Sequence, residues 1–191
     1  MPDRNEAALA FLATRRSRPH KLLQPPVPER AELEELLAIG ARVPDHGKLE
    51  PWRYIVLEKA AMTRLAGAVA ARAEARGEDE GRRDKIVAQY ANASLCVAVV
   101  SAPKPADIPL EEQVASAACV AFQLLNACLA AGWGANWLTD WPAFDRPFLE
   151  SELGLAAEET LAGFIHIGTA ASAPPERPRP DVPALTRWVS A

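Results

Sequence analysis

The sequence has few of the residues that build metal sites and disulfide frameworks. Its 191 residues include three cysteines and three histidines, with no Cys-x-x-Cys pair and no paired-histidine spacing. This scarcity excludes a zinc site, and we expect no bound metal. Cys96, Cys119 and Cys128 each lie within an apolar run, which predicts reduced, buried thiols.

Excess positive charge and a hydrophobic leader are also missing. The 21 basic residues against 25 acidic ones give a formal net charge of -4, which argues against nucleic acid as a partner. Asp3 and Glu6 precede any apolar stretch, so the beginning of the sequence is not typical of a secretory signal. We therefore expect a cytoplasmic protein that binds neither nucleic acid nor membrane.

Glycine-rich phosphate loops and hydrolase motifs are absent. Gly132-x-Gly134 lacks the third glycine and the preceding strand of a dinucleotide-binding turn. No Walker sequence and no Gly-x-Ser-x-Gly occurs. The sequence thus offers no side-chain constellation for hydrolysis, and we name no catalytic residue.

Hydrophobic periodicity predicts alternating helices and strands. The expected helices are Asn5–Thr14, Pro28–Ala41, Lys59–Arg76, Arg83–Ala91, Val114–Ala131 and Phe144–Leu153. The expected strands are Trp52–Leu57, Leu95–Val100, Ala135–Leu138 and Ala162–Ile167, with the valine-rich second strand buried on both faces. From Pro174 the chain is rich in proline, which favours an extended arm over residues 174–191 of a single domain, 1–191.

The longest apolar segment, Val114–Ala131, has almost no charge on any side. Its length also suits a membrane span, but Ser116, Gln123 and Asn126 interrupt it. Because its small residues suit close helix packing, we favour a buried core or interface helix.

Arg15-Arg16-Ser17 follows the first expected helix and offers two guanidinium groups and a hydroxyl to a phosphate. An Arg-Arg pair at a helix end is also compatible with plain solvated surface. A second motif, Pro44-Asp45-His46, precedes Pro51-Trp52, and His46 either contacts a ligand or caps a turn beside Asp45. We interpret His166, between two isoleucines, as structural.

These motifs, with Gly132-Trp133-Gly134-Ala135-Asn136-Trp137, occur in an order that resembles the nitroreductase family, especially its small bacterial YdjA-like group. The resemblance covers nearly the whole chain. It implies an α+β fold with a central, mainly antiparallel sheet wrapped by helices. It also implies an intertwined homodimer with flavin mononucleotide (FMN) at the interface.

The resemblance assigns FMN-binding roles to several groups of residues. Those expected at the phosphate and ribityl chain are Arg15, Arg16 and Ser17, with Arg177 and Arg179 on the arm. Those expected to reach the flavin from the partner subunit are Arg42 and His46, and those lining the isoalloxazine are Trp137, Leu138 and Thr139. Those implied for NAD(P) contact are Ala127, Cys128, Leu129, Ala130, Ala131 and Gly132.

The implied activity is hydride transfer from NAD(P)H through FMN to a nitroaromatic, a quinone or a similar electrophile. Two alternatives stay open. One is other chemistry on the same flavin, such as dehalogenation or flavin fragmentation. The other is a flavin-binding module without catalysis.

Overall fold

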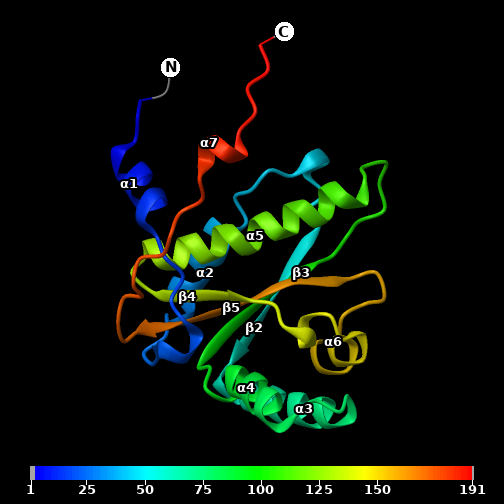
Figure 1. The fold of residues 1–191 in the computed structure, drawn as a ribbon. Helices are drawn as coiled ribbons and strands as arrows, with labels where there is room; N and C mark the ends of the chain where they lie inside the picture. Colours follow the sequence, from blue (N-terminus) through cyan, green and yellow to red (C-terminus); the bar gives the residue numbers. More distant parts are fainter. Residues whose placement is uncertain (1–2, 191) are drawn as a thin grey trace.

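A five-stranded sheet forms the centre of the molecule in the computed structural model, which describes residues 3–190 (Figure 1). Its strands are β1 (Leu23–Gln24), β2 (Trp52–Glu58), β3 (Leu95–Ser101), β4 (Gly134–Leu138) and β5 (Thr160–Ala170). The order is β1-β5-β3-β2, β4 also pairs with β5, and every pairing among these strands is antiparallel. The predicted antiparallel sheet is confirmed, whereas the two-residue β1 was not predicted.

Helices cover both faces of this sheet. Those that pack on the sheet and its layers are α2 (Arg30–Gly40), α3 (Lys59–Ala75), α4 (Glu80–Ala91), α5 (Leu110–Ala130) and α6 (Arg146–Leu153), while α1 (Glu6–Thr14) and α7 (Val182–Leu185) lie outside the core. Short 3-10 turns lie at His20–Leu22, His46–Lys48 and Trp141–Ala143. The α+β class follows, with helices close to their predicted bounds.

Strand β3 divides the core into two layers, because successive side chains point to opposite faces. Cys96, Ala98 and Val100 face a cluster built with α3, α4 and α6. Val97 and Val99 face a second cluster built with α2 and α5. Every residue of β3 is buried, as the valine-rich run predicts.

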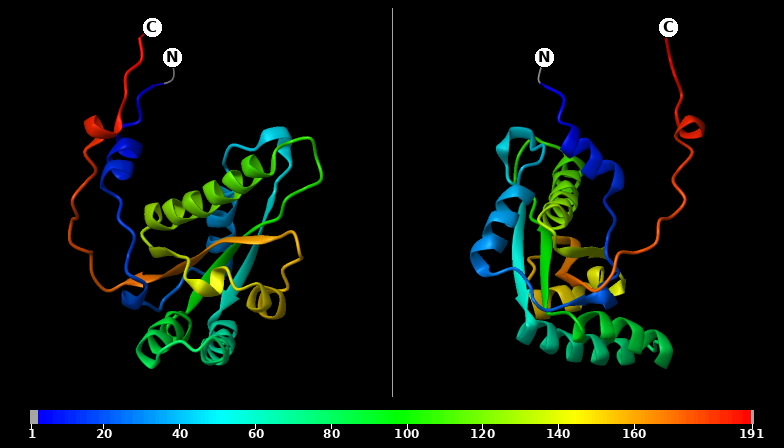
Figure 2. Two further views of the ribbon diagram at one scale, coloured as in Figure 1. Left: turned by 45° about the vertical axis from the view of Figure 1, so that its right-hand side comes forward. Right: turned by 90° about the vertical axis from the view of Figure 1, so that its left-hand side faces the viewer.

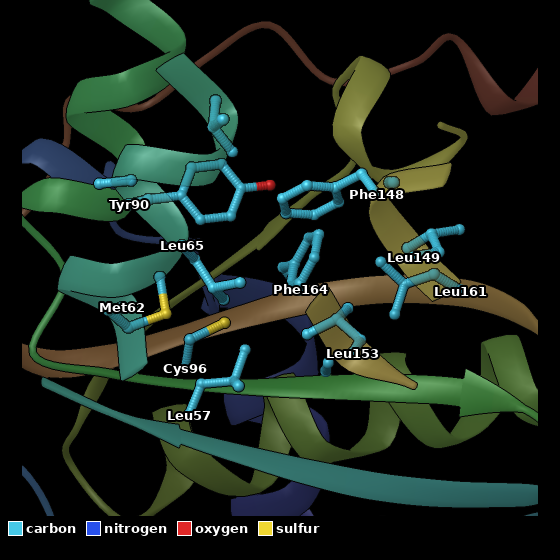
Figure 3. Packing of buried hydrophobic residues seen from close by; sticks show 14 of the residues in the cluster. Leu57, Met62, Leu65, Tyr90, Cys96, Phe148, Leu149, Leu153, Leu161 and Phe164 are labelled. Atoms are coloured by element: carbon cyan, nitrogen blue, oxygen red, sulfur yellow. The ribbon is translucent and has the colours of Figure 1, made fainter. Parts of the chain in front are cut away.

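Aromatic packing holds the first of these layers together (Figure 3). The Tyr90 ring meets Phe148 and Phe164 edge to face, with centroids 6.2 and 5.7 Å apart. Met62 and Leu65 beside them are fully buried. Burial also raises the pKa of the Tyr90 hydroxyl well above its ordinary value.

Helix α5 packs against the sheet and α2 on one side only. By length and composition it could cross a membrane, but Val120, Ala121 and Leu124 fill the core beneath it. Its outer side exposes Val114 and Phe122, so the expectation of a helix buried all round is wrong for the single chain. For the same reason Cys119 is exposed, which corrects the prediction of three buried thiols, while Cys96 and Cys128 are buried.

Beyond Ala170 the chain leaves the sheet as an arm that runs to the same side of the molecule as α1 (Figures 1 and 2). It is interrupted by the one-turn helix α7, in which the Asp181 side chain accepts a hydrogen bond from the Ala184 amide. Leu185 and Trp188 are exposed there. The arm therefore presents apolar side chains that the single chain does not cover.

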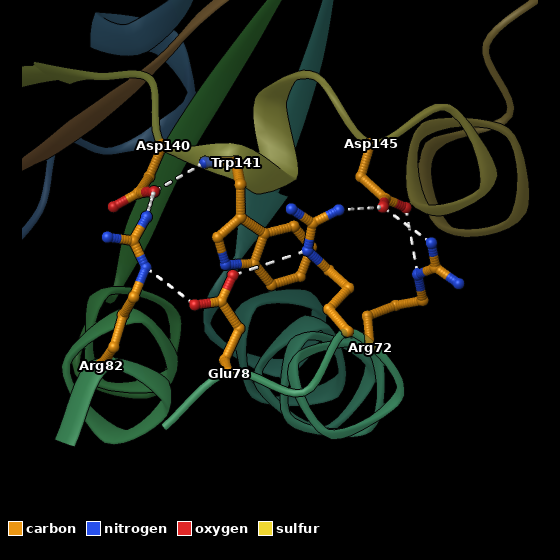
Figure 4. Close-up of polar contacts among 7 residues, drawn as sticks. Arg72, Glu78, Arg82, Asp140, Trp141 and Asp145 are labelled. Carbon is orange, nitrogen blue, oxygen red and sulfur yellow. Dashed lines mark hydrogen bonds and ion pairs between the residues drawn. The ribbon is translucent and has the colours of Figure 1, made fainter. Parts of the chain in front are cut away.

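An ion network ties the α3–α4 hairpin to the segment that follows β4 (Figure 4). The Asp145 carboxylate accepts two hydrogen bonds from Arg72, at 3.1 and 2.7 Å, and lies 3.3 Å from Arg76. Arg82 bridges Glu78, at 2.8 Å, and Asp140, at 3.5 Å. The network fixes the chain directly after the strand that carries Trp137 and Leu138.

Candidate functional site

The Arg15-Arg16-Ser17 loop leaves α1 and lies along β4. The Arg18 amide donates to the Ala135 carbonyl at 2.8 Å, and the Asn136 side chain donates to the Arg18 carbonyl at 2.7 Å. The Arg15 amide ends α1 by donating to Phe11. These bonds place the triplet beside the strand that continues into Trp137.

The triplet and the arm together line a cavity of about 290 Å³. Its walls are Arg15, Arg16, Ser17, Arg177 and Arg179, so residues about 160 positions apart meet around one space. One Arg15 nitrogen donates to the Ser17 hydroxyl at 3.2 Å. The triplet and the arginine pair of the arm, which the resemblance assigned to one phosphate, therefore lie together.

The electrostatics of this cavity suit an anion. Burial, and then the positive charges of Arg179 and Arg16, lower the pKa of the Arg15 guanidinium. The Arg15 Nε is buried and has no hydrogen-bond partner among the described residues. Arginine offers a planar fork of donors that matches phosphate oxygens. An unpaired buried donor within a cluster of like charges fits a phosphate group.

Strand β4 presents Trp137 and Leu138, and Thr139 follows as an exposed residue. The Trp137 indole lies across β5 and donates to the Ala162 carbonyl at 3.2 Å. A Cβ atom on Gly163 would lie 1.9 Å from the indole Nε1, so only glycine leaves room for the ring. The Trp137 indole can therefore lie in this position only because residue 163 is glycine.

Gly163→Ala is expected to move the Trp137 indole and to destabilise the fold by about 1–3 kcal/mol, as overpacking does. The change is measured by urea unfolding and by a shifted tryptophan emission. Gly67→Ala in α3 is the matched control, because a Cβ there meets nothing within 4 Å. Alanine also favours helix over glycine, so this control is expected to be neutral or slightly stabilised. Equal stability of the two variants would contradict the proposed packing.

His46 lies apart from the cavity within one chain, and neither His46 nor Arg42 is among the residues that line it. His46 Nδ1 is 2.8 Å from the Glu112 carboxylate in the first turn of α5, whereas Arg15 stacks 6.0 Å from the Phe122 ring centre. Ten helical residues separate these anchor points, which is about 15 Å along the axis. The Asp45 carboxylate accepts hydrogen bonds from the Leu49 and Glu50 amides that follow the turn, so Asp45 rather than His46 holds this loop.

The segment implied for NAD(P) is only partly accessible. Ala127 and Cys128 are buried, while Ala130 and Ala131 are exposed. Leu129 and Gly132 line a second cavity of about 580 Å³ together with Arg15, Arg16 and Trp133. Burial raises the pKa of the Cys128 thiol to about 12, which leaves it unreactive near neutral pH.

Other features lie away from this site. Another cavity, of about 630 Å³ between α2 and the β2 edge, contains none of the predicted site residues. His166 is buried, and burial, followed by the nearby His20, lowers its pKa to about 3, as suits a structural histidine. No cluster of three metal-ligating side chains occurs among residues 3–190.

Sequence reasoning missed two contributors to the site. Glu176 lies on the arm among the arginines, and its sequence position gives no sign of this contact. Gly163 did carry a signal, because a glycine inside a strand often marks a close approach of another group.

Comparisons with known proteins show the family and the fold. A model of the Nitroreductase family matches residues 12–169. The chain is 29% identical over 163 residues to the Escherichia coli K12 protein named "Putative NAD(P)H nitroreductase YdjA", covering 85% of this chain and 87% of that protein. A nitroreductase-like family protein from Bacillus cereus has the same fold, with a TM-score of 0.81, 20% identity and full coverage of both chains. A nitroreductase from Desulfovibrio desulfuricans solved in complex with FMN gives a TM-score of 0.74 at 20% identity, covering 99% of this chain and 100% of that one. Because the family model spans most of the sequence, the chain belongs to the nitroreductase family.

Proposed function

We propose that the protein is an FMN-dependent oxidoreductase that takes hydride from NAD(P)H and passes it to a nitroaromatic, a quinone or a similar electrophile. The observation that carries the proposal is the arginine cavity with its unpaired buried Arg15 Nε. Family membership supports the reaction class, and the FMN-bound Desulfovibrio structure and the name of the Escherichia coli relative support the cofactor and the electron donor.

The chain's own residues would bind and orient the cofactor. Arg15, Arg16 and Ser17, with Arg177 and Arg179, would hold the phosphate by charge-assisted hydrogen bonds. The segment Trp137, Leu138 and Thr139 would line the ring, held by the Gly163 contact and by the ion network after β4. FMN would supply the two-electron chemistry. The task of the protein is then positioning, which is why we assign no catalytic side chain.

For the nicotinamide nucleotide we propose Ala127 to Gly132, with Leu129 and Gly132 as the residues that reach a cavity. We also propose that the enzyme works in the cytoplasm. Helix α5 packs against the sheet as a core helix, which favours this location over a membrane.

The test is an anaerobic reduction of the purified yellow protein. Addition of NADH or NADPH is expected to bleach the flavin absorbance near its visible maximum, and a quinone added next is expected to restore it. A yellow protein that neither donor bleaches would favour a flavin-binding module. Bleaching without reoxidation by a quinone or a nitroaromatic would favour other chemistry on the same fold.

We further propose a homodimer with FMN at its interface. The Glu112 partner of His46 lies about 15 Å along α5 from the Phe122 anchor of Arg15, so a single chain does not gather all the expected flavin contacts. The outer face of α5 and the nearby α1 expose Leu12, Val114 and Phe122, which a second copy would cover.

Val114→Glu is expected to convert this dimer to monomer in light scattering, because it places a charge in the apolar interface. Ile39→Glu in α2 is a matched control, since the two side chains have similar exposure, 42% for Val114 and 44% for Ile39. The control should remain dimeric. A wild-type protein that is monomeric and yet retains FMN stoichiometrically would contradict the interface placement of Arg42 and His46.

A further inference from the structure

Glu176 is the carboxylate nearest to the arginine cavity. Its Oε1 lies 2.8 Å from an Arg179 nitrogen and 3.7 Å from an Arg16 nitrogen. The same Arg16 nitrogen donates to the Pro175 carbonyl at 2.6 Å. Arg16 thus holds the arm at Pro175 and Glu176, and Arg179 pairs with Glu176 within the arm.

This contact does not serve the core. The Glu176 side chain is 63% exposed, and the arm around it packs no buried residue. Its pKa is lowered first by a hydrogen bond from the Arg177 amide and then by Arg179 and Arg16, so it is ionised near neutral pH. The cavity is lined by four guanidinium groups, and one carboxylate that contacts two of them still leaves an excess of positive charge.

We propose that Glu176 is an internal anion at the phosphate site, one that competes with an incoming phosphate monoester for Arg16 and Arg179 and so sets how tightly FMN is held. The inference rests on the proposed function and deepens it. A phosphate carries up to two negative charges and three acceptor oxygens, so it outcompetes a single exposed carboxylate. The competition lowers the net affinity, because the arginine contacts to Glu176 are lost when the phosphate binds.

The same contact couples cofactor occupancy to the arm. When a phosphate takes Arg16 and Arg179, Glu176 loses both cationic partners. The arm then depends on Arg177 and Arg179 contacting the phosphate directly. Before a phosphate binds, Glu176 therefore ties the arm to Arg16 beside the cavity.

The experiment titrates the full-length, FMN-stripped protein with FMN, with riboflavin and with inorganic phosphate. Glu176→Gln is expected to bind FMN roughly two- to fivefold more tightly than the wild type, the scale of one exposed ion pair. Inorganic phosphate should also bind Glu176→Gln more tightly than it binds the wild type. Riboflavin, which has no phosphate, should bind both proteins equally. Glu158→Gln is the control, since Glu158 is exposed and forms no ion pair among the described residues.

The outcomes separate the two proposals. Equal or weaker FMN and phosphate binding by both Glu176→Gln and Glu176→Ala would overturn the competition and make Glu176 a positioning residue of the arm. Tighter phosphate binding by the variants, with no FMN binding by any protein, would retain the competition and overturn the FMN assignment. An equal gain for riboflavin would also overturn it, because the effect would then not act through phosphate.

Discussion

Arg16→Ala is expected to lower the affinity for FMN at least tenfold. Arg16 lines both cavities beside β4 and carries one of the charges that would hold the phosphate. A buried hydrogen bond to a charged group contributes about 1.5–3 kcal/mol, which corresponds to a factor of about ten or more in the dissociation constant. Quenching of flavin fluorescence during titration of the stripped protein measures the change.

The control for this variant is Arg30→Ala, because the Arg30 side chain is 92% exposed and, among residues 3–190, pairs only with Glu34 one helical turn away. Its FMN affinity should match that of the wild type. Arg53 is unsuitable as a control, since it donates two 2.6 Å hydrogen bonds to the buried carboxylate of Glu159. Equal FMN affinity of Arg16→Ala and the wild type would show that Arg15-Arg16-Ser17 is ordinary solvated surface and does not bind the phosphate.

Asp145→Ala is expected to lower the free energy of unfolding by about 2–4 kcal/mol. The carboxylate is almost completely buried, accepts from Arg72 twice, and caps α6 by accepting from the Phe148 amide at 3.0 Å. Removing the Asp145 carboxylate leaves Arg72 and Arg76 without their partner and also removes the N-terminal cap of α6. Urea unfolding measures the loss. Asp107→Ala, at an exposed loop residue, should stay within about 0.5 kcal/mol of the wild type.

The Asp145 contribution should also depend on pH. Burial alone would raise the pKa of this carboxyl, but hydrogen bonds from Arg72 and from the Phe148 amide, with the charges of Arg72 and Arg76, lower it below the ordinary value. A lowered folded-state pKa means that the stabilisation is complete above the unfolded value of about 3.9 and is lost as the pH falls through the folded value. The difference between the wild type and Asp145→Ala should therefore be constant near neutral pH and shrink below about pH 4. A constant difference down to strong acid would contradict an ionised, paired Asp145.

Most of the fold could be predicted because local patterns agree with the tertiary packing. The valine run of β3 and the apolar face of α2 predict their burial directly. The two-residue β1 is too short to give a period, and its pairing with β5 depends on long-range contacts. Helix α5 begins at Leu110, about one turn before the predicted start at Val114. The extra turn contains Glu111 and Glu112, and acidic side chains stabilise the N-terminus of a helix.

The site was predictable only in part. The resemblance paired Arg15 and Arg16 with Arg177 and Arg179, and the structure brings them around one cavity. No local pattern could place Glu176 there, because that contact depends on the path of the arm across about 160 intervening residues. The exposure of Cys119 was not predicted for a related reason. The sequence of an apolar helix does not show which of its faces packs against the rest of the chain and which stays exposed.

The cavity walls come from two segments about 160 residues apart in the sequence, which has a consequence for biosynthesis. Arg15 and Arg16 leave the ribosome long before Arg177 and Arg179 are added. Folding begins from the N-terminal side during synthesis, so the sheet can assemble while the arm is still being translated. A nascent chain that has not reached Arg177 therefore has half of the anion site, and the cofactor can be captured with full affinity only after the arm has been made.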